Sequence, residues 1–333
     1  MTEKTKFGFC VPAWTYASPW DRRIDYSLIK NAVTTSECLG YDSIWVPDHV
    51  MLGHYNENYE AWTLLTALSQ ITESVRLGTL VTNPQHRSPA MLAKTVATLD
   101  NLSEGRVELG IGAGWMRTEQ VAYGLPWNNS PKVRIGQLID TLEIVIGMWT
   151  NDSFTYKGDY YSVDGAICAP GPIQKPRPNI WIGGGGEKKT LRVAAKYGDG
   201  WNAGELAPED YAHKLDVLKG HCQKLGKDYD HIQKSLETYV IITNRHEELE
   251  KAKDWGNFSM AELFQQLKLE FKPPVSSLDD WKKQYIMGTR SEVTDRIAEY
   301  IKVGVNHFMM YFIDYPTLDS MKAFARDVIP SVS

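Results

Sequence analysis

Short apolar runs, each long enough for one buried strand, alternate along the chain with segments whose apolar residues recur every three or four positions. Such alternation is typical of a parallel sheet covered by amphipathic helices. Eight strands are predicted, at Lys6–Val11, Ser43–Val46, Val75–Val81, Arg106–Ile111, Asn179–Ile182, Gly200–Ala203, Ser235–Thr243 and His307–Ile313. The pattern therefore predicts an α/β fold, a closed (β/α)8 TIM barrel that takes up residues 1–333 as a single domain.

Capping residues and prolines mark where the helices begin and end. Ser88-Pro89 and Ser130-Pro131 each open a segment of helical spacing, and proline is favoured at the first helical position. Thr289 to Glu292 forms a capping box, which predicts another helix start. We expect the last helix to run from Thr317 to Ile329 and to stop at Pro330, because proline has no N–H to donate.

Two stretches are longer than the connections that a barrel needs. Residues 151–178 are rich in Gly and Pro and contain a hairpin-like F-T-Y-K-G-D-Y-Y-S-V, while residues 244–287 mix charged and apolar positions. Insertions in barrels usually shape the site, so we expect both at or near the C-terminal face. Ser259 to Glu262 repeats the capping-box pattern and predicts a helix start inside the second insertion. The pattern leaves open whether this insertion is a lid or a structural or dimer-forming element.

Composition narrows the class of partner. The chain has 333 residues, 43% hydrophobic and 23% charged, with a formal net charge of −5 at pH 7. This is the composition of a folded globular protein. The acidic balance, without a basic tail or cluster, argues against nucleic acid and against an anionic membrane surface. We expect small molecules as partners.

The cysteines and the N-terminus bear on location. Cys10, Cys38, Cys168 and Cys222 stand far apart and form no C-x-x-C pair, so neither a zinc knuckle nor a disulfide framework is indicated. The chain runs from a short polar start into a strand without signal-peptide features, and it has no apolar run of membrane-spanning length. A cytoplasmic protein is expected.

Four consecutive glycines follow the predicted strand at 179–182. Gly183, Gly184, Gly185 and Gly186 have no Cβ, so the backbone can take positive φ and turn its N–H groups toward an anion at the start of the next helix. Lys188 and Lys189 add positive charge. The alternative is a strand-to-helix turn that merely needs flexible residues. Four glycines favour a phosphate site, because each carries an entropic cost of up to about 1 kcal/mol that packing alone does not offset.

Functional groups in a barrel come from the C-terminal ends of its strands. These ends combine small, aromatic and polar residues, as suits a planar heteroaromatic ligand with a phosphate at one end. They comprise Pro12, Trp14, Asp48, His49, Thr82, Asn83, Pro84, His86, Arg87, Gly112–Trp115, Gly183–Gly186, Gly204 and Glu205.

Three other motifs are not fulfilled. Gly110 to Trp115 resembles a dinucleotide-binding fingerprint, but Trp115 stands where its third glycine belongs and no acidic residue follows at the required distance. Gly186 is followed by Glu187 rather than Lys, so there is no Walker motif. Asp48-His49 lacks a further ligand at metal-binding spacing, and no metal is expected.

Asp48-His49 is the candidate catalytic pair. A lone histidine is often structural, but an imidazole at a barrel strand end can donate a proton to, or take one from, a reacting oxygen. Asp48 would then orient the ring or bind the cofactor. The sequence leaves the structural and the catalytic interpretations open.

Four segments, in this order, carry a family resemblance: G-Y-D-S-I-W-V-P-D-H-V, L-G-T-L-V-T-N-P-Q-H-R-S-P-A-M-L-A-K, G-R-V-E-L-G-I-G-A-G-W and I-G-G-G-G-E-K-K-T-L-R-V-A-A-K-Y-G-D-G-W-N. With them the chain resembles the bacterial-luciferase-like superfamily over nearly its whole length. W-x-x-D-H and I-G-G-G-G-E-K-K-T-L are most similar to the branch that uses the deazaflavin coenzyme F420. That branch includes glucose-6-phosphate dehydrogenase, secondary alcohol dehydrogenase and methylenetetrahydromethanopterin reductase.

The resemblance implies a (β/α)8 barrel, usually a homodimer, that holds the coenzyme ring at its C-terminal mouth. It places Asp48 and His49 near the reactive edge of the ring, Leu80-Val81 at a strand bulge with a non-prolyl cis peptide, and Gly183–Gly186 on the phosphate. The other positions expected in the cofactor pocket are Thr82, Asn83, Gly114 and Trp115.

The chain departs from the sugar-phosphate dehydrogenases at two positions. Where they have a catalytic glutamate after G-x-G-x-G, this chain has Trp115, and a tryptophan that follows their D-H is replaced by Gly53. Glucose 6-phosphate is therefore not the expected substrate. Glu119 and Tyr123, on the turn or helix after Trp115, either line the site instead or belong to a solvated face.

The resemblance thus predicts an oxidoreductase that moves a hydride between F420 and a small organic substrate, with His49 as the proton donor or acceptor. The alternatives are a monooxygenase that uses reduced FMN in the same barrel and a non-catalytic protein that holds flavin or F420. The insertions would set selectivity, and they carry no motif that identifies the substrate.

Overall fold

A computed structural model describes residues 4–14, 23–52, 56–204, 206–267 and 277–332. Eight parallel strands form a barrel, which closes where β8 pairs with β9. Going around it, the strands are β1 (Lys6–Cys10), β2 (Ser43–Val46), β3 (Arg76–Thr79), β4 (Val107–Ile111), β7 (Asn179–Gly183), β8 (Gly200–Gly204), β9 (Gln233–Ile242) and β11 (His307–Phe312). The predicted (β/α)8 barrel and its strands are confirmed, and every predicted strand boundary lies within two residues of the observed one.

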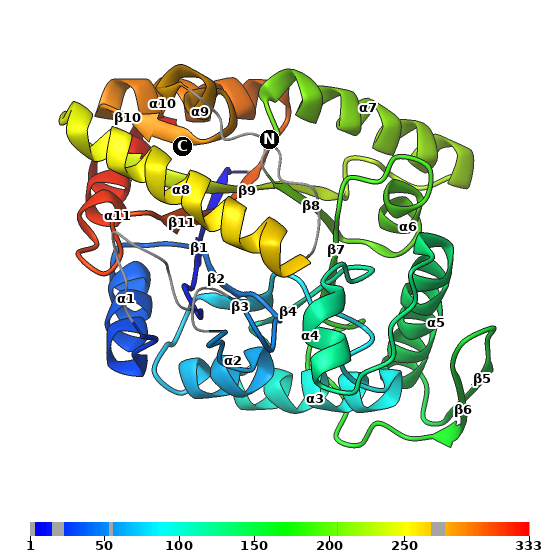
Figure 1. The fold of residues 1–333 in the computed structure, drawn as a ribbon. Coiled ribbons are helices and arrows are strands. Elements are labelled where there is room, and N and C mark those ends of the chain that lie inside the picture. The colour runs from blue at the N-terminus through cyan, green and yellow to red at the C-terminus, as the bar shows by residue number, and fades with distance from the viewer. Residues whose placement is uncertain (1–3, 15–22, 53–55, 205, 268–276, 333) are drawn as a thin grey trace.

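Helices surround the strands (Figure 1). They are α1 (Tyr26–Cys38), α2 (Ala61–Ser69), α3 (Pro89–Leu102), α4 (Arg117–Ala122), α5 (Pro131–Thr150), α6 (Thr190–Tyr197), α7 (Pro208–Leu225), α8 (His246–Leu267), α9 (Leu278–Gln284), α10 (Arg290–Val303), α11 (Asp319–Ala323) and α12 (Ile329–Val332). The predicted starts at Pro89 and Pro131 are confirmed, and both bonds of the capping box at Thr289 and Glu292 are present. No helix in the described part of the chain is long and apolar enough to cross a membrane.

Two predicted helix boundaries are wrong. The chain stays helical through Pro330, since a π-helical turn at Phe324–Val328 continues directly into α12, which contains the proline. Ser259 lies inside α8, which begins at His246. The good helix formers at 247–253 have already established the helix before it reaches Ser259, so the capping-box pattern marks no start there.

Two tryptophans fill the inside of the barrel, and glycines on neighbouring strands make room for them. Trp45 and Trp181 meet edge to face, with ring centroids 5.4 Å apart. A Cβ on Gly78 would lie 2.3 Å from Cζ3 of Trp45, and one on Gly200 would lie 2.2 Å from Cε3 of Trp181. Glycine is therefore required at both positions for each ring to lie against the neighbouring strand.

A polar layer lies below the tryptophans, near the N-terminal ends of the strands. Nε2 of His307 is 2.9 Å from the Ser43 hydroxyl, and the Trp181 indole donates to Glu108 at 2.8 Å. Burial lowers the pKa of His307 to about 3, with a smaller contribution from the charge of Lys6. This imidazole is therefore neutral at physiological pH. Together with Ser43 and Glu108 it fills the barrel interior near the N-terminal ends of the strands.

Residues 151–178 do not lie at the C-terminal face, and the expectation that they do is wrong. They contain a hairpin of β5 (Phe154–Lys157) and β6 (Ser162–Ala166), which lies at the edge of the molecule beyond α5 (Figure 1). Gln174 bonds Arg76 at the start of β3 and the carbonyl of Val107 at the start of β4. The reason is topological: α5 returns the chain to the N-terminal end of the barrel before this segment begins.

Residues 244–287 do lie at the C-terminal side. They form α8, α9 and the short strand β10 (Ile286–Gly288), which pairs with the last residues of β9. Their own core contains Trp255, Trp281 and Tyr285, and Tyr239 packs against it from the barrel. Helix α8 crosses in front of the strands in Figure 1 and contacts α4.

We expect the substitution Gly78→Ala to lower the free energy of unfolding by about 1–3 kcal/mol, because the added methyl overpacks against the fully buried Trp45. Gly220→Ala is the matched control. Gly220 lies inside α7 and its Cβ would meet nothing within 4 Å, so this change should stabilise by about 0.5–1 kcal/mol. Urea denaturation of both variants tests the pair. Equal stability of Gly78→Ala and wild type would show that Trp45 is free to move aside.

Candidate functional site

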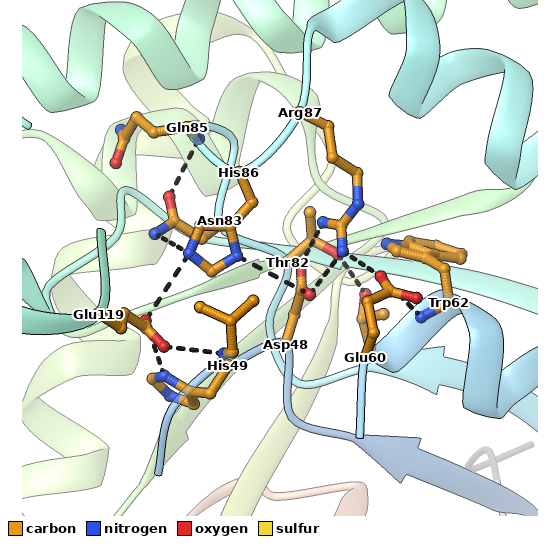
Figure 2. A network of polar contacts seen from close by, with 12 residues as sticks. Asp48, His49, Glu60, Trp62, Thr82, Asn83, Gln85, His86, Arg87 and Glu119 are labelled. Atoms are coloured by element: carbon orange, nitrogen blue, oxygen red, sulfur yellow. Dashed lines mark hydrogen bonds and ion pairs between the residues drawn. The ribbon is translucent and has the colours of Figure 1, made fainter. Parts of the chain in front are cut away.

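A buried ion pair joins the loops that follow β2 and β3. Both oxygens of Asp48 accept from the Arg87 guanidinium, at 2.5 and 2.8 Å. Arg87 also binds Glu60, the N-cap of α2, whose carboxylate accepts from the Trp62 and Thr63 amides. Asp48 is 2% exposed. Figure 2 shows the three charged groups side by side.

Burial alone would raise the pKa of Asp48, but His86 and the Arg87 charge together hold it well below its ordinary value. A lowered pKa means that the carboxylate stabilises the fold above the pKa of an unfolded aspartate. This contribution is lost only as the pH falls through the lower, folded value. Asp48 is therefore a charged group at neutral pH whose oxygens are both occupied.

His49 is held by Glu119, a residue of α4. Its Nδ1 lies 2.9 Å from one carboxylate oxygen of Glu119, and the other oxygen accepts from the amides of Val50 and Met51 at 2.9 and 3.4 Å. Glu119 is 1% exposed, so the interpretation of a solvated face is wrong. Burial would raise the pKa of Glu119, but the His49 bond and charge and the Val50 amide outweigh it and lower the pKa.

The second imidazole nitrogen of His49 is open. Within the described residues Nε2 has no hydrogen-bond partner, and it is not among the buried unpaired atoms. The His49 side chain is 16% exposed. Trp115 meets its ring edge to face at 5.5 Å and is itself 50% exposed. An accessible imidazole nitrogen therefore stands beside an exposed aromatic ring, at the C-terminal end of β2.

His86 lies between the two buried carboxylates. Its Nδ1 is 3.9 Å from Asp48, and its Nε2 is 3.7 Å from Glu119 and 3.1 Å from Nδ2 of Asn83. Oδ1 of Asn83 accepts from the Gln85 amide, so the NH2 group of Asn83 points at His86. Nε2 of His86 then accepts, and its proton is on Nδ1, toward Asp48.

Leu80-Val81 is a non-prolyl cis peptide, as the resemblance implied. Val81 packs over two neighbouring strand ends: a Cβ on Gly112 would lie 2.8 Å from Val81, and one on Gly183 would lie 2.9 Å from it. Thr82 is fully buried and its hydroxyl donates to Thr79, so its side chain does not face a ligand. Gly114 has φ +72°.

The tetraglycine bend presents free amides. Gly184 has φ +114°, donates to the Asn202 carbonyl at 3.0 Å, and accepts from the Trp201 indole. Gly185 and Gly186 are exposed, and their amides donate to no described residue. A Cβ on Gly185 would meet only Lys214, at 3.9 Å. One side of the bend is thus anchored while the other has room for an anion just ahead of α6.

One cation beside the bend already has a partner. Nζ of Lys214 is 2.6 Å from Glu187, which His213 also approaches at 3.3 Å. Lys188 and Lys189 are exposed. Among the described residues, no group of three or more His, Cys, Asp or Glu side chains is placed to hold a metal ion.

The structure brings Asp48, His49, Asn83 and Trp115 into one region and links it, through Val81, to Gly183. It does not open the carboxylate of Asp48 or the side chain of Thr82 to a ligand. His86 and Arg87 were expected at the strand ends without a specific role, Glu60 was not anticipated, and the role of Glu119 was left open. One signal was available, since Glu119 follows Trp115 by only four residues and lies in the first turn of α4. Gly53 and Glu205 lie outside the described residues.

The family model described as luciferase-like monooxygenase matches residues 5–307. An F420-dependent glucose-6-phosphate dehydrogenase of Amycolatopsis mediterranei is 29% identical, covering 92% of this chain and 94% of that protein. An FMNH(2)-dependent dimethylsulfone monooxygenase of Pseudomonas putida is 24% identical, covering 100% and 96%. An F420-dependent secondary alcohol dehydrogenase, solved with an F420-acetone adduct, superposes with a TM-score of 0.83 at 24% identity, covering 99% of this chain and 100% of that one.

We expect Arg87→Ala to lower the free energy of unfolding by about 3–5 kcal/mol, because it leaves the buried Asp48 without its counter-charge. Adding Asp48→Asn in the double variant should recover part of that loss. Arg326→Ala breaks an exposed ion pair with Asp327 and should change nothing measurable. Denaturant unfolding compares them, and an Arg87→Ala protein as stable as wild type would contradict the assignment.

Proposed function

The chain belongs to the luciferase-like monooxygenase family, and on that premise we propose that it is an F420-dependent oxidoreductase. It transfers a hydride between the coenzyme and a small organic substrate. The observation that carries the proposal is the similarity, over nearly the full length of both proteins, to an F420-dependent dehydrogenase. Cytoplasmic location and a homodimer remain predictions.

The tetraglycine bend fits the phosphate of such a coenzyme. The amides of Gly185 and Gly186 are exposed and unpaired within the described chain, and the space above Gly185 is open. Lys188 and Lys189 supply positive charge ahead of α6. The bend adjoins the Leu80-Val81 segment through the contact of Val81 with Gly183, so one ligand can reach from the bend to the mouth. These features support an anionic, elongated cofactor.

His49 supplies proton transfer. Bound F420 would carry the hydride, and the protein would orient it against the substrate. The open Nε2 of His49 can take a proton from a substrate hydroxyl, or return one to a carbonyl oxygen in the reverse direction. Trp115 packs edge to face against the same imidazole ring. The imidazole is therefore the catalytic group that we propose.

We assign Asp48 a positioning role rather than the catalytic or cofactor-binding role expected from the sequence. Its carboxylate is buried and bonded twice to Arg87, so contact with a ligand would first require that pair to break. By holding Arg87 it fixes the loop after β3, which carries Asn83 and His86. Leu80, Val81, Gly114 and Trp115 remain proposed cofactor contacts, together with the backbone of Thr82 and Asn83.

The cofactor is tested by titrating the purified protein with F420 and, separately, with FMN, and following the fluorescence of each. We expect saturable binding of F420. Binding of FMN alone would replace the proposal with the FMN-dependent monooxygenase alternative, for which the Pseudomonas putida relative is the precedent. Binding of F420 without turnover of any alcohol or carbonyl tested would favour the non-catalytic carrier.

The anion site is tested by Gly185→Asp, which we expect to weaken F420 binding roughly 10- to 100-fold, since about 1–3 kcal/mol is typical for a misplaced charge at a binding site. Gly185→Ala is the control. It adds a Cβ into open space at a position without positive φ and should bind nearly as wild type. Equal affinity of both variants would show that the coenzyme anion binds elsewhere.

A further inference from the structure

We propose that Glu119 is the positioning residue that fixes the tautomer of His49, with the proton on Nδ1 and the lone pair on Nε2. The inference rests on the proposed role of His49, but its geometry is independent of the cofactor. The Nδ1 of His49 is 2.9 Å from Glu119, and an ionised carboxylate only accepts hydrogen bonds. Nδ1 must therefore be the donor, which leaves Nε2 as the nitrogen that exchanges a proton with substrate.

Glu119 does not itself act on substrate. It is 1% exposed, and both of its oxygens are bonded, one to His49 and the other to the amides of Val50 and Met51. A carboxylate so enclosed cannot approach a ligand at the mouth. Its effect on chemistry passes through the imidazole, as does that of any buried group that orients a base.

Helix α4 is anchored so that this carboxylate is placed reproducibly. Gln120, the next residue, is fully buried and donates to Gln85, which in turn donates to the carbonyl of Ala113. Tyr123, at the end of the helix, donates to the carbonyl of Val50 at 3.2 Å. The helix thus grips the turn after β2 through Glu119 and Tyr123, and only Glu119 contacts the imidazole.

Among the described residues, Glu119 is the only acidic group in contact with the His49 ring. His86 approaches the same oxygen of Glu119 at 3.7 Å, but its own proton is directed at Asp48. Arg87 is bound to Asp48 and Glu60. Trp115 meets the ring by its edge and offers no acceptor. The direction of the His49 proton therefore depends on Glu119.

Glu119→Gln reverses this direction without removing the side chain. The amides of Val50 and Met51 are donors, so they retain the carbonyl oxygen of the new glutamine on their side. The NH2 group must then face Nδ1 of His49. Two donors cannot share one hydrogen bond, so Nδ1 becomes the acceptor and the proton moves to Nε2. The nitrogen at the mouth is then blocked as a base.

The decisive measurement is the 15N spectrum of histidine-labelled protein at a pH where His49 is neutral, with its signals assigned from a His49→Gln spectrum. We expect the protonated-nitrogen signal on Nδ1 in wild type and on Nε2 in Glu119→Gln. Glu119→Asp keeps a carboxylate and should retain the wild-type tautomer. Tyr123→Phe removes a bond to the same turn without touching the ring, and should also retain it.

A wild-type signal from the Nε2–H form, or an unchanged tautomer in Glu119→Gln, would overturn the inference. A change in Tyr123→Phe as large as that in Glu119→Gln would assign the effect to the turn instead. If Glu119→Gln is unfolded, Glu119→Asp and the wild-type spectrum still decide the tautomer. None of these readouts needs F420, so failure of the proposed function and failure of this inference are separable.

Turnover adds a second test. With F420 and 2-propanol as probes, we expect Glu119→Gln to lose roughly 100-fold or more in kcat, as is typical when general base catalysis is removed. Its fluorescence-measured affinity for F420 should stay within twofold of wild type, because the tetraglycine bend is untouched. Partial recovery in Glu119→Asp is expected. If the wild-type protein binds F420 but does not turn over 2-propanol, that result excludes 2-propanol as a substrate. The tautomer of His49 is still decided by the 15N spectrum.

Discussion

The site depends on keeping charged side chains buried at one end of an apolar barrel. Removing Asp48 from water is costly unless a counter-charge and hydrogen bonds replace the solvent. Arg87 does this with a planar fork that matches the carboxylate, and the same guanidinium also binds Glu60. Because the three residues come from the loop after β2, the loop after β3 and the start of α2, their pairing fixes these segments against one another.

His49 inherits its position from that arrangement. It follows Asp48 directly, and its ring is held from the other side by α4, which comes after β4. The imidazole is therefore tied to three successive strand ends, with one nitrogen committed and the other open. Preorganisation of this kind is what a proton-transfer group needs, since a base that must first find its orientation loses rate.

Much of the fold could be predicted because its signals are local. Each strand is a short apolar run. The helix starts at Ser88-Pro89 and at Thr289 to Glu292 are each marked by residues within one turn of one another. The same distinction between local and long-range signals applies to the site. The tetraglycine bend is written in one segment, whereas the partner of His49 is 70 residues away, and spacing along the chain does not reveal such a contact. The cis peptide at Leu80-Val81 was anticipated by family resemblance alone. Residues 151–178 were predicted at the wrong end of the barrel. Helix α5 carries the chain back to the N-terminal end before this segment begins, and no short motif within the segment reveals that.

The short strand β10 lengthens the sheet beside β9, at the C-terminal side of the barrel. Val240 of β9 pairs with Phe312 on one edge and with Ile286 on the other, so β10 continues along the edge of β9 that β8 leaves bare beyond Gly204. The sheet therefore extends further at β9, and α8 and α9 pack beside this extension. The insertion core around Trp255, Trp281 and Tyr285 therefore adjoins a strand that is hydrogen-bonded to β9, so backbone pairing as well as side-chain packing holds this insertion to the barrel.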